Sequence, residues 1–399
     1  MHFKTCKKRR SRFCILCLKN RDGSHVLQKA KGKPMKPKIL VTSAAGKTGM
    51  ATALQLLKKD FPVRALVRRK DARSQFLHKA GAEIVIGEMH DIDSLREAFK
   101  GCQRAYWCTP VESHPLHKMS LFAIAAAEAK VEHIVHLSQW LSSSSHPSLA
   151  TREMWMMDHI LDWIPGVTMT INNTGWFADN YALVMLPMAQ LGMMPMPLGE
   201  GKNAPPSNDD IAAVNVGALI NPEDHAGRTY RPTGPELLTP QEIADAFGRA
   251  LGRTVRYDNA SMKMFLKALA AQKQPEFAQS QLAHYVVDYQ QDAFALGAPT
   301  DAVEKVGGRR PQTMDEIARH YAQTDPDARQ TVINKVRAFS FLVKIMTATP
   351  LDREKFERSR EFPSSRTPEY AVSDDAWLAT HPENSRLRSA SITTINAAE

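Results

Sequence analysis

One stretch of the chain decides its fold: Lys38-Ile39-Leu40-Val41-Thr42-Ser43-Ala44-Ala45-Gly46-Lys47-Thr48-Gly49. A β-branched, apolar run leads into a turn of small residues, and a helical pattern with Met50, Leu54 and Leu57 follows. A strand, a glycine turn and a helix in this order are typical of a phosphate-binding loop. The N-terminus of such a helix offers free N–H groups and the positive end of its dipole to a phosphate.

The glycines of this turn have separate tasks. Gly46 lets the backbone approach a pyrophosphate, and Gly49 lets the helix pack closely on the strand. The motif has two glycines because Ser43 holds the usual first position, so a strand–turn–helix unit without a ligand stays an alternative. We predict that a dinucleotide binds along Ser43, Ala44, Ala45, Gly46, Lys47, Thr48 and Gly49.

The end of the second strand indicates which dinucleotide binds. An NAD site carries Asp or Glu about twenty residues after the glycine turn, where the acid binds the ribose hydroxyls. Here the strand of residues 61–67 ends in Arg68, Arg69 and Lys70, and Arg73 follows. Guanidinium groups bind phosphate through paired hydrogen bonds. The cluster therefore favours NADP and leaves NAD possible, and a solvated basic helix start is the alternative.

The rest of the first half alternates strand and helix patterns, which predicts an α/β fold with a doubly wound parallel sheet. The further strands are predicted at residues 82–86, 104–109, 131–137 and 167–171, with helices between them. From about residue 190 the rhythm changes to mostly helical patterns. We expect four parts: a basic leader (1–34), a Rossmann domain (35–190), a smaller, mostly helical substrate lobe (191–347) and a polar, loosely ordered tail (348–399).

The net charge of +10 resembles that of a nucleic-acid-binding protein, but its location argues against this. Residues 1–34 hold eleven Lys and Arg against one acid, Asp22, so residues 35–399 are neutral overall. The folded part has no basic surplus for a polyanion. The leader is expected to be disordered or spuriously translated. No apolar run approaches the roughly eighteen residues of a membrane span, so no membrane partner is expected.

The cysteines bear on metal binding and on the cellular compartment. Cys6, Cys14, Cys17 and His25 in the leader could hold zinc, but the second pair of a regular zinc ribbon is absent, so we expect no metal. Five cysteines in 399 residues indicate a reducing, cytoplasmic compartment without a disulfide framework.

Four motifs resemble those of the NmrA-like family of atypical short-chain dehydrogenases, over residues 37–325. They are Ser43-x-x-Gly46-x-x-Gly49, Gly87-Glu88-x-x-Asp91 before Ser94-Leu95, Gly175-Trp-Phe-Ala-Asp-Asn180 and Arg231-Pro-Thr-Gly-Pro-Glu-Leu-Leu. The resemblance implies a Rossmann domain with a small C-terminal lobe and an NAD(P) ligand. It also implies that residues 43–49 line the pyrophosphate, Arg68 the 2′-phosphate and Thr109 the ribose.

The chain departs from active short-chain dehydrogenases at the proton donor. Those enzymes use Tyr-x-x-x-Lys on the helix after the fifth strand, where the ammonium lowers the pKa of the phenol. No tyrosine of this chain has a lysine four residues later, and matching Asp158 to the acid after the pair puts Ala150 and Met154 in its place. Ser138 and His146 are the remaining weak candidates for catalysis.

Aromatic residues near the same strand ends suggest a pocket for an acceptor. Trp140 follows the fifth strand, and Trp176 and Asn180 follow the sixth. Core tryptophan is the alternative for such residues, and the carboxyl end of a strand makes Trp176 the better pocket candidate.

Two functions remain open. The first is an NADPH-dependent oxidoreductase that reduces a quinone-like or other small aromatic acceptor, since the cofactor carries the difficult chemistry. The second is a non-catalytic NADP(H)-sensing regulator that binds a protein partner, which the missing Tyr–Lys pair favours. Nucleic-acid binding would depend on the leader alone. The sequence specifies neither a substrate nor an oligomeric state.

Overall fold

The computed structural model of the chain describes residues 15–19, 25–29, 36–110, 112 and 115–381. It divides into two compact units, residues 1–37 and 38–399. In the first unit β1 (Ile15–Lys19) pairs antiparallel with β2 (His25–Lys29). These two strands fall within the leader that was expected to be disordered or spuriously translated, and its other residues lie outside the described ones. Cys6 and Cys14 of the zinc hypothesis lie outside the described residues.

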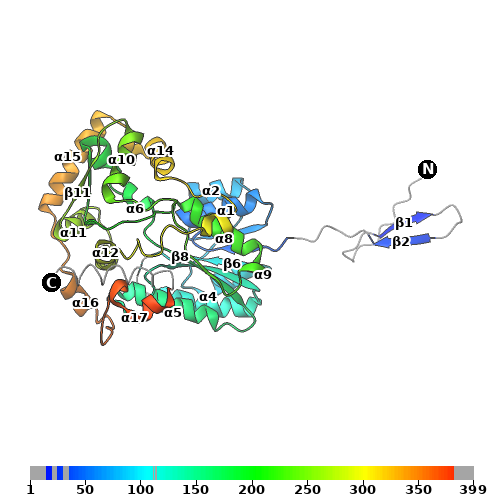
Figure 1. Ribbon diagram of the computed structural model, residues 1–399. Helices are drawn as coiled ribbons and strands as arrows, with labels where there is room; N and C mark the ends of the chain where they lie inside the picture. The colour runs from blue at the N-terminus through cyan, green and yellow to red at the C-terminus, as the bar shows by residue number, and fades with distance from the viewer. Residues whose placement is uncertain (1–14, 20–24, 30–35, 111, 113–114, 382–399) are drawn as a thin grey trace. The chain divides into compact units, whose positions relative to one another are not determined.

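A parallel sheet of seven strands forms the centre of the second unit, in the order β10-β8-β7-β6-β3-β4-β5 (Figure 1). Its strands are β3 (Ile39–Val41), β4 (Val63–Val67), β5 (Glu83–Ile86), β6 (Arg104–Trp107), β7 (His133–Gln139), β8 (Thr168–Thr174) and β10 (Thr229–Tyr230). Within this sheet the chain runs from β3 in the interior out to β5 at one edge. It then returns to β6 beside β3 and continues to the other edge. The predicted doubly wound parallel sheet is confirmed. Strand order reverses between β3 and β6, where such sheets bind ligands.

Helices cover both faces of the sheet (Figure 1). On one face Ile39 and Val41 pack with α1 (Lys47–Lys58), α2 (Ala72–Lys79) and α8 (Asn208–Ile220). On the other face Leu40 packs with α3 (Ile92–Phe99), α4 (Pro115–Ala129) and α5 (Leu149–Asp162). This split follows from the strand period of two, which sends neighbouring side chains to opposite faces.

Elements that follow the boundary expected at residue 190 join the Rossmann layers, within one compact unit of residues 38–399. Helix α8 lies against α1 and strand β10 pairs with β8, so both belong to the Rossmann layers although they follow residue 190. Asn215 in α8 also donates to Thr52 Oγ1 in α1, at 3.1 Å. The sequence of a helix does not show which layer it packs against, because its apolar face fits the sheet and the lobe equally well.

The C-terminal lobe is mostly helical around a second core that contains Trp140, Trp176, Tyr181 and Tyr289. Its only described sheet pairs β9 (Met193–Met196) with β11 (Arg256–Asn259) in parallel. The remaining helices are α6 (Asp179–Ala182), α7 (Met185–Leu191), α9 (Pro222–His225), α10 (Pro240–Leu251), α11 (Met262–Ala271), α12 (Glu276–Gln290), α13 (Ala302–Lys305), α14 (Met314–Thr324), η1 (Pro326–Ala328) and α15 (Val332–Thr347). Among the described residues no helix combines the length and hydropathy needed to cross a bilayer.

The tail is more ordered up to His381 than its composition suggested. It forms α16 (Arg353–Ser359), η2 (Ala371–Ser373) and α17 (Asp375–Thr380). Trp377 is 2% exposed, and its indole N–H donates to the carbonyl of Trp140 at 3.0 Å. Asp374 accepts hydrogen bonds from Ser143 and Ser145. A few buried contacts hold this segment in place although it is polar on average. Its average composition does not reveal these contacts.

Trp377→Ala tests how firmly the tail is held. Removing a buried tryptophan leaves a cavity, so the free energy of unfolding should fall by about 3–5 kcal/mol. The matched control is Trp163→Ala, because Trp163 is 73% exposed and its loss should change stability by less than about 0.5 kcal/mol. Urea unfolding of both variants measures the difference. Equal stability of the two variants would contradict the docking of the tail.

Candidate functional site

The turn after β3 has a backbone shape that serine rarely adopts. Ser43 has a φ of 47°, in the left-handed region, and its hydroxyl donates to the carbonyl of Cys108 at 2.8 Å. This bond ties the turn to the end of β6 and holds a conformation that glycine usually supplies. A Cβ on Gly49 would lie 2.4 Å from the carbonyl oxygen of Ser43, so only glycine fits there. The first turn of α1 therefore lies against the backbone of the loop.

The N-terminus of α1 keeps its donors free of side-chain caps. Gly46 is the N-cap residue, it makes no side-chain capping bond, and the first turn contains no acid. The leading N–H groups of a helix lack partners within the helix, and they attract an anion. The arrangement has the features of a phosphate cradle.

A cavity of about 400 Å³ lies at this helix start, along the carboxyl ends of β3, β4 and β5. Its lining residues are Ser43, Ala45, Gly46, Leu66, Val67, Arg68, Arg69, Asp71, Arg73, Gly87, Glu88, Met89, Pro110, Glu112 and Lys118. Four of our predicted cofactor residues are thus brought together: Ser43, Ala45, Gly46 and Arg68.

Charges in the cavity are largely paired, with one exception. The Arg73 guanidinium lies 2.7 Å from Asp71 and Arg69 lies 3.7 Å from it. The hydrogen bonds from Arg73 and from the Ser74 N–H lower the pKa of Asp71 to about 2, so this carboxylate stays charged. Lys118 pairs with Glu112. Arg68 lines the cavity and makes no ion pair within the described part of the chain, which leaves its guanidinium available to an added phosphate.

The other predicted cofactor residues point elsewhere. Ala44 is fully buried in the core, and the Thr48 hydroxyl lies 3.8 Å from the Cys108 sulfur. Lys47 is paired with Asp179 of α6 at 2.6 Å. Thr109 is partly exposed beside Pro110, which lines the cavity. These residues do not line the cavity, and any contact of theirs with a dinucleotide stays a prediction.

Several lining residues escaped the sequence analysis as site residues. Gly87, Glu88 and Met89 follow β5, and the rule that ligands lie at the carboxyl ends of parallel strands could have found them. Asp71 follows the basic cluster directly and was passed over, although it caps α2 and pairs with Arg73. Glu112 and Lys118 carried no signal, because only the fold brings them to this edge.

The positions of the missing Tyr–Lys pair are apolar in the structure as well. Ala150 and Met154 lie one turn apart on α5, and Met154 packs against the core beneath the sheet. Nearby, the Ser138 hydroxyl donates to Asp158 at 3.0 Å, and Ser142 donates to the same oxygen at 2.8 Å. The proton of Ser138 is therefore committed to a carboxylate.

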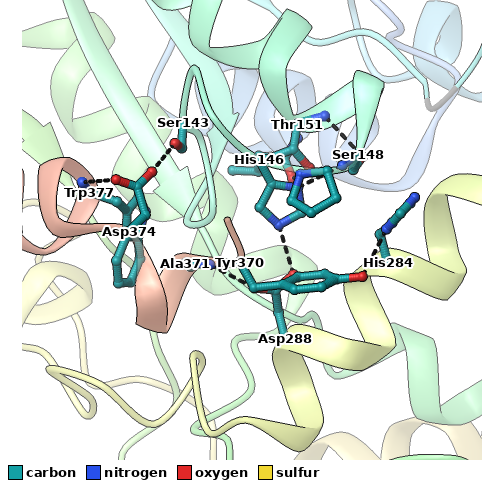
Figure 2. Close-up of polar contacts among 12 residues, drawn as sticks. Ser143, His146, Ser148, Thr151, His284, Asp288, Tyr370, Ala371, Asp374 and Trp377 are labelled. Atoms are coloured by element: carbon teal, nitrogen blue, oxygen red, sulfur yellow. Dashed lines mark hydrogen bonds and ion pairs between the residues drawn. The ribbon is translucent and has the colours of Figure 1, made fainter. Parts of the chain in front are cut away.

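His146 is enclosed, where a loop histidine is more often solvated. Its Nδ1 accepts from the Ser148 N–H at 3.0 Å, so the proton lies on Nε2, which donates to Asp288 at 2.9 Å. Both side chains are fully buried, and Asp288 also accepts from the Ala371 N–H of the tail. Figure 2 shows the tail residues Tyr370 and Ala371 against this pair. Proton donation by His146 to an acceptor would require the tail to move, and its catalytic role stays a prediction.

The predicted pocket residues lie mostly in the core of the lobe. Trp140 is 4% exposed, with Arg231 stacked on its ring at 3.6 Å and Trp377 edge-on to it. Trp176 is 3% exposed and packs among aromatic rings that include Tyr289. Asn180 is partly exposed in α6. The two tryptophans are thus core residues, which was the alternative to a role in a pocket. Their contact with an acceptor stays a prediction.

The free cysteines Cys102 and Cys108 form no disulfide, and among the described residues no group of three or more His, Cys, Asp or Glu side chains is placed to hold a metal. The site is thus defined by the glycine turn, the free helix start and the cationic rim.

The strand order and the glycine turn define the class of the protein: a Rossmann-type α/β fold with an uncapped helix start and a cavity at its switch point. The chain belongs to the NmrA-like family, whose model matches residues 35–318. The resemblance read from the four motifs is confirmed.

Among curated proteins the chain is similar to an NAD(P)H azoreductase of Xenophilus azovorans, with 28% identity over 291 residues, 71% of this chain and 98% of that protein. Among solved structures it is similar to an NADPH-dependent quinone oxidoreductase from Escherichia coli complexed with NADPH, with a TM-score of 0.61, 25% identity and coverage of 71% and 99%. The negative transcriptional regulator NmrA in complex with NADP gives a TM-score of 0.62 at 18% identity, with coverage of 75% and 99%.

Gly46→Val tests the cradle. Gly46 has φ −80° and ψ 170°, an extended conformation that valine adopts readily, but a Cβ there would lie 3.1 Å from the Ser43 carbonyl oxygen, so the loop must shift slightly and circular dichroism checks that the variant folds. The branched side chain would stand at the free helix start and should abolish dinucleotide binding. Ala51→Val, which adds bulk one turn further along α1, should leave binding intact. Titration calorimetry with NADPH measures both variants, and normal binding by a folded Gly46→Val protein would refute the cradle.

Proposed function

We propose that the protein is an NADPH-dependent oxidoreductase that reduces a quinone-like or other small aromatic acceptor. The observation that carries the proposal is the cavity at the start of α1, where an uncapped helix N-terminus lies beside Arg68, a residue without an ion pair among those the structure describes. An azoreductase and a quinone oxidoreductase among its relatives support this class of acceptor. The acceptor is a small molecule, and we place the protein in the cytoplasm on its cysteine content.

The residues of the cavity fit NADP. The Gly46 N–H donates to the Ser43 carbonyl at 2.8 Å, so the N–H groups of Lys47 and Thr48 would bind the pyrophosphate, and the tight approach at Gly49 leaves no side chain in the way. Arg68 would bind the 2′-phosphate, and Arg69 and Arg73, which share Asp71, would add positive potential. When bound, NADPH supplies a hydride. NAD also fits the turn and lacks the phosphate that Arg68 would bind.

The acceptor class follows from what is missing on α5. Ala150 and Met154 cannot supply the phenol and ammonium that deliver a proton to a developing alkoxide. Ser138 donates to Asp158 and His146 donates to Asp288, so neither proton is free in this conformation. A quinone needs less help, because its reduced form is a stabilised phenolate.

One observation favours the second candidate, a regulator that senses NADP(H). The tail from α16 to His381 lies beyond the region matched by the family model and covers Trp140 and His146. If the tail covers the residues predicted to meet an acceptor, the protein would be suited to signal cofactor binding to a partner instead of reducing a substrate. We rank it second, because tail displacement would reopen the same surface for an acceptor.

Arg68→Ala tests the choice of cofactor. Only NADPH carries the extra phosphate, and one charge-assisted contact is worth roughly 1.5–3 kcal/mol, so NADPH affinity should fall by about ten- to a hundredfold. NADH affinity should barely change. Lys70→Ala is the control, because Lys70 is exposed and does not line the cavity. Equal losses for both nucleotides would show that Arg68 is structural.

An acceptor panel tests the chemistry. General acid catalysis is worth about a hundred- to ten-thousandfold, so without it simple ketones and aldehydes should be poor substrates even when NADPH is bound. Quinones should be reduced much faster, and His146→Ala should leave their reduction largely unchanged. Absorbance of NADPH follows each reaction. Fast ketone turnover would reveal an unidentified donor, and tight NADPH binding without turnover of any acceptor would favour the regulator.

A further inference from the structure

Helix α15 (Val332–Thr347) exposes an apolar stripe. Val332 is 77% exposed, Val336 60%, Phe339 61%, Val343 64% and Met346 65%. Their spacing of four, three, four and three residues places them on one side of the helix. Single exposed apolar residues are ordinary, but a continuous stripe over four turns marks an interaction surface.

A different side of the same helix already anchors it to the lobe. Asn334, Ala338 and Ile345 are buried, and Asn334 donates to the carbonyls of Pro326 and Arg329 at 2.9 Å. By the 3.6-residue period these residues lie roughly opposite the apolar stripe. The stripe therefore faces away from the lobe core, and α15 lies at the outer edge of the lobe beside α11 (Figure 1).

The charged residues of α15 have one sign. Residues 328–347 contain Arg329, Lys335, Arg337 and Lys344 and no acid, and α11 adds Lys263 and Lys267 without an acid. Lys267 donates to the carbonyl of Met346 at 2.8 Å, which ties the two helices together. Asp327, the nearby acid, is neutralised by Arg337 at 2.6 Å. An apolar stripe between basic residues is the pattern of a helix that lies on an anionic bilayer surface.

The surface next to the stripe extends the apolar area. A cavity of about 320 Å³ opens between α11 and α15, with Leu183, Met264, Phe265, Phe341, Leu342 and Ile345 in its lining. Leu183 is 58% exposed and Met264 37%. Acyl chains at the headgroup boundary could contact this area when the stripe is inserted.

A second copy of the chain fits the stripe less well. Pairing α15 with itself would bring Lys335 and Lys344 of both copies toward one seam, with no acid on the helix to offset them. Like charges across such a seam are destabilising. The helix is also only about 24 Å long, so a seam of five side chains falls short of the roughly 1,200 Å² of a stable interface.

We propose that α15, with the basic residues of α11, docks the protein on the surface of an anionic lipid bilayer. None of the described helices is long and apolar enough to span a membrane, and adsorption of one helix face does not require a span. The proposal does not depend on the enzymatic activity, because α15 contributes nothing to the dinucleotide cavity.

Vesicle co-sedimentation of the full chain tests the proposal. Vesicles of phosphatidylcholine mixed with phosphatidylglycerol should bind the protein, and vesicles of phosphatidylcholine alone should bind it weakly. Phe339→Glu should reduce binding by roughly tenfold or more, because it removes an inserted ring and adds a repelled charge. Lys335→Gln and Lys344→Gln should each reduce it by roughly fivefold. Ile124→Glu on α4, where Ile124 is 48% exposed, is the matched control and should bind as the wild type does.

Three outcomes would overturn the proposal. The first is no binding of the wild type to anionic vesicles. The second is binding that Phe339→Glu leaves unchanged, which would assign adsorption to the basic leader. The third is a dimer, seen by analytical ultracentrifugation without lipid, that Phe339→Glu dissociates. NADPH titration checks that each variant is folded, since none of the positions lines the cavity.

Discussion

The site depends on one close contact, the approach of Gly49 to the carbonyl of Ser43. A Cβ at position 49 would lie 2.4 Å from that oxygen, so the first turn of α1 can reach the loop only because the side chain is absent. The Ser43 hydroxyl then ties the same loop to Cys108 at the end of β6. Together these contacts hold an uncapped helix N-terminus over the point where the strand order reverses. The cavity with Arg68 follows from that placement.

The strand pattern made the doubly wound sheet predictable, because parallel strands buried on both faces read as short apolar runs at regular spacing. The cradle was predictable for the same reason, since Gly46 and Gly49 carry their role in the local sequence. Contacts between segments far apart in the sequence were not predictable. Helix α8 packs on α1 from far along the chain, and Lys118 reaches the cavity only through the fold. Neither has a motif.

The residues predicted to bind the acceptor also depend on contacts with a distant segment of the chain. Trp140 and His146 stand at positions where the sequence suggests chemistry, and both are covered by a segment more than two hundred residues away. The tail averages as polar, so composition gave no reason to expect Trp377 in the core. The lack of a Tyr–Lys pair, in contrast, could be recognised from the sequence. The pair is defined by a fixed spacing of four residues, so a search of the sequence is enough to show that it is missing. The glycine turn predicted to bind the cofactor is thus local in sequence, whereas the segment that covers Trp140 and His146 is distant from them.

The central claim is that the turn and Arg68 recognise NADPH, and a crystal structure of the protein grown with NADPH tests it most directly. The account predicts the pyrophosphate at the N–H groups that open α1 and the 2′-phosphate within hydrogen-bond distance of the Arg68 guanidinium. A dinucleotide bound away from the start of α1, or one whose 2′-phosphate faces solvent with Arg68 turned elsewhere, would contradict it.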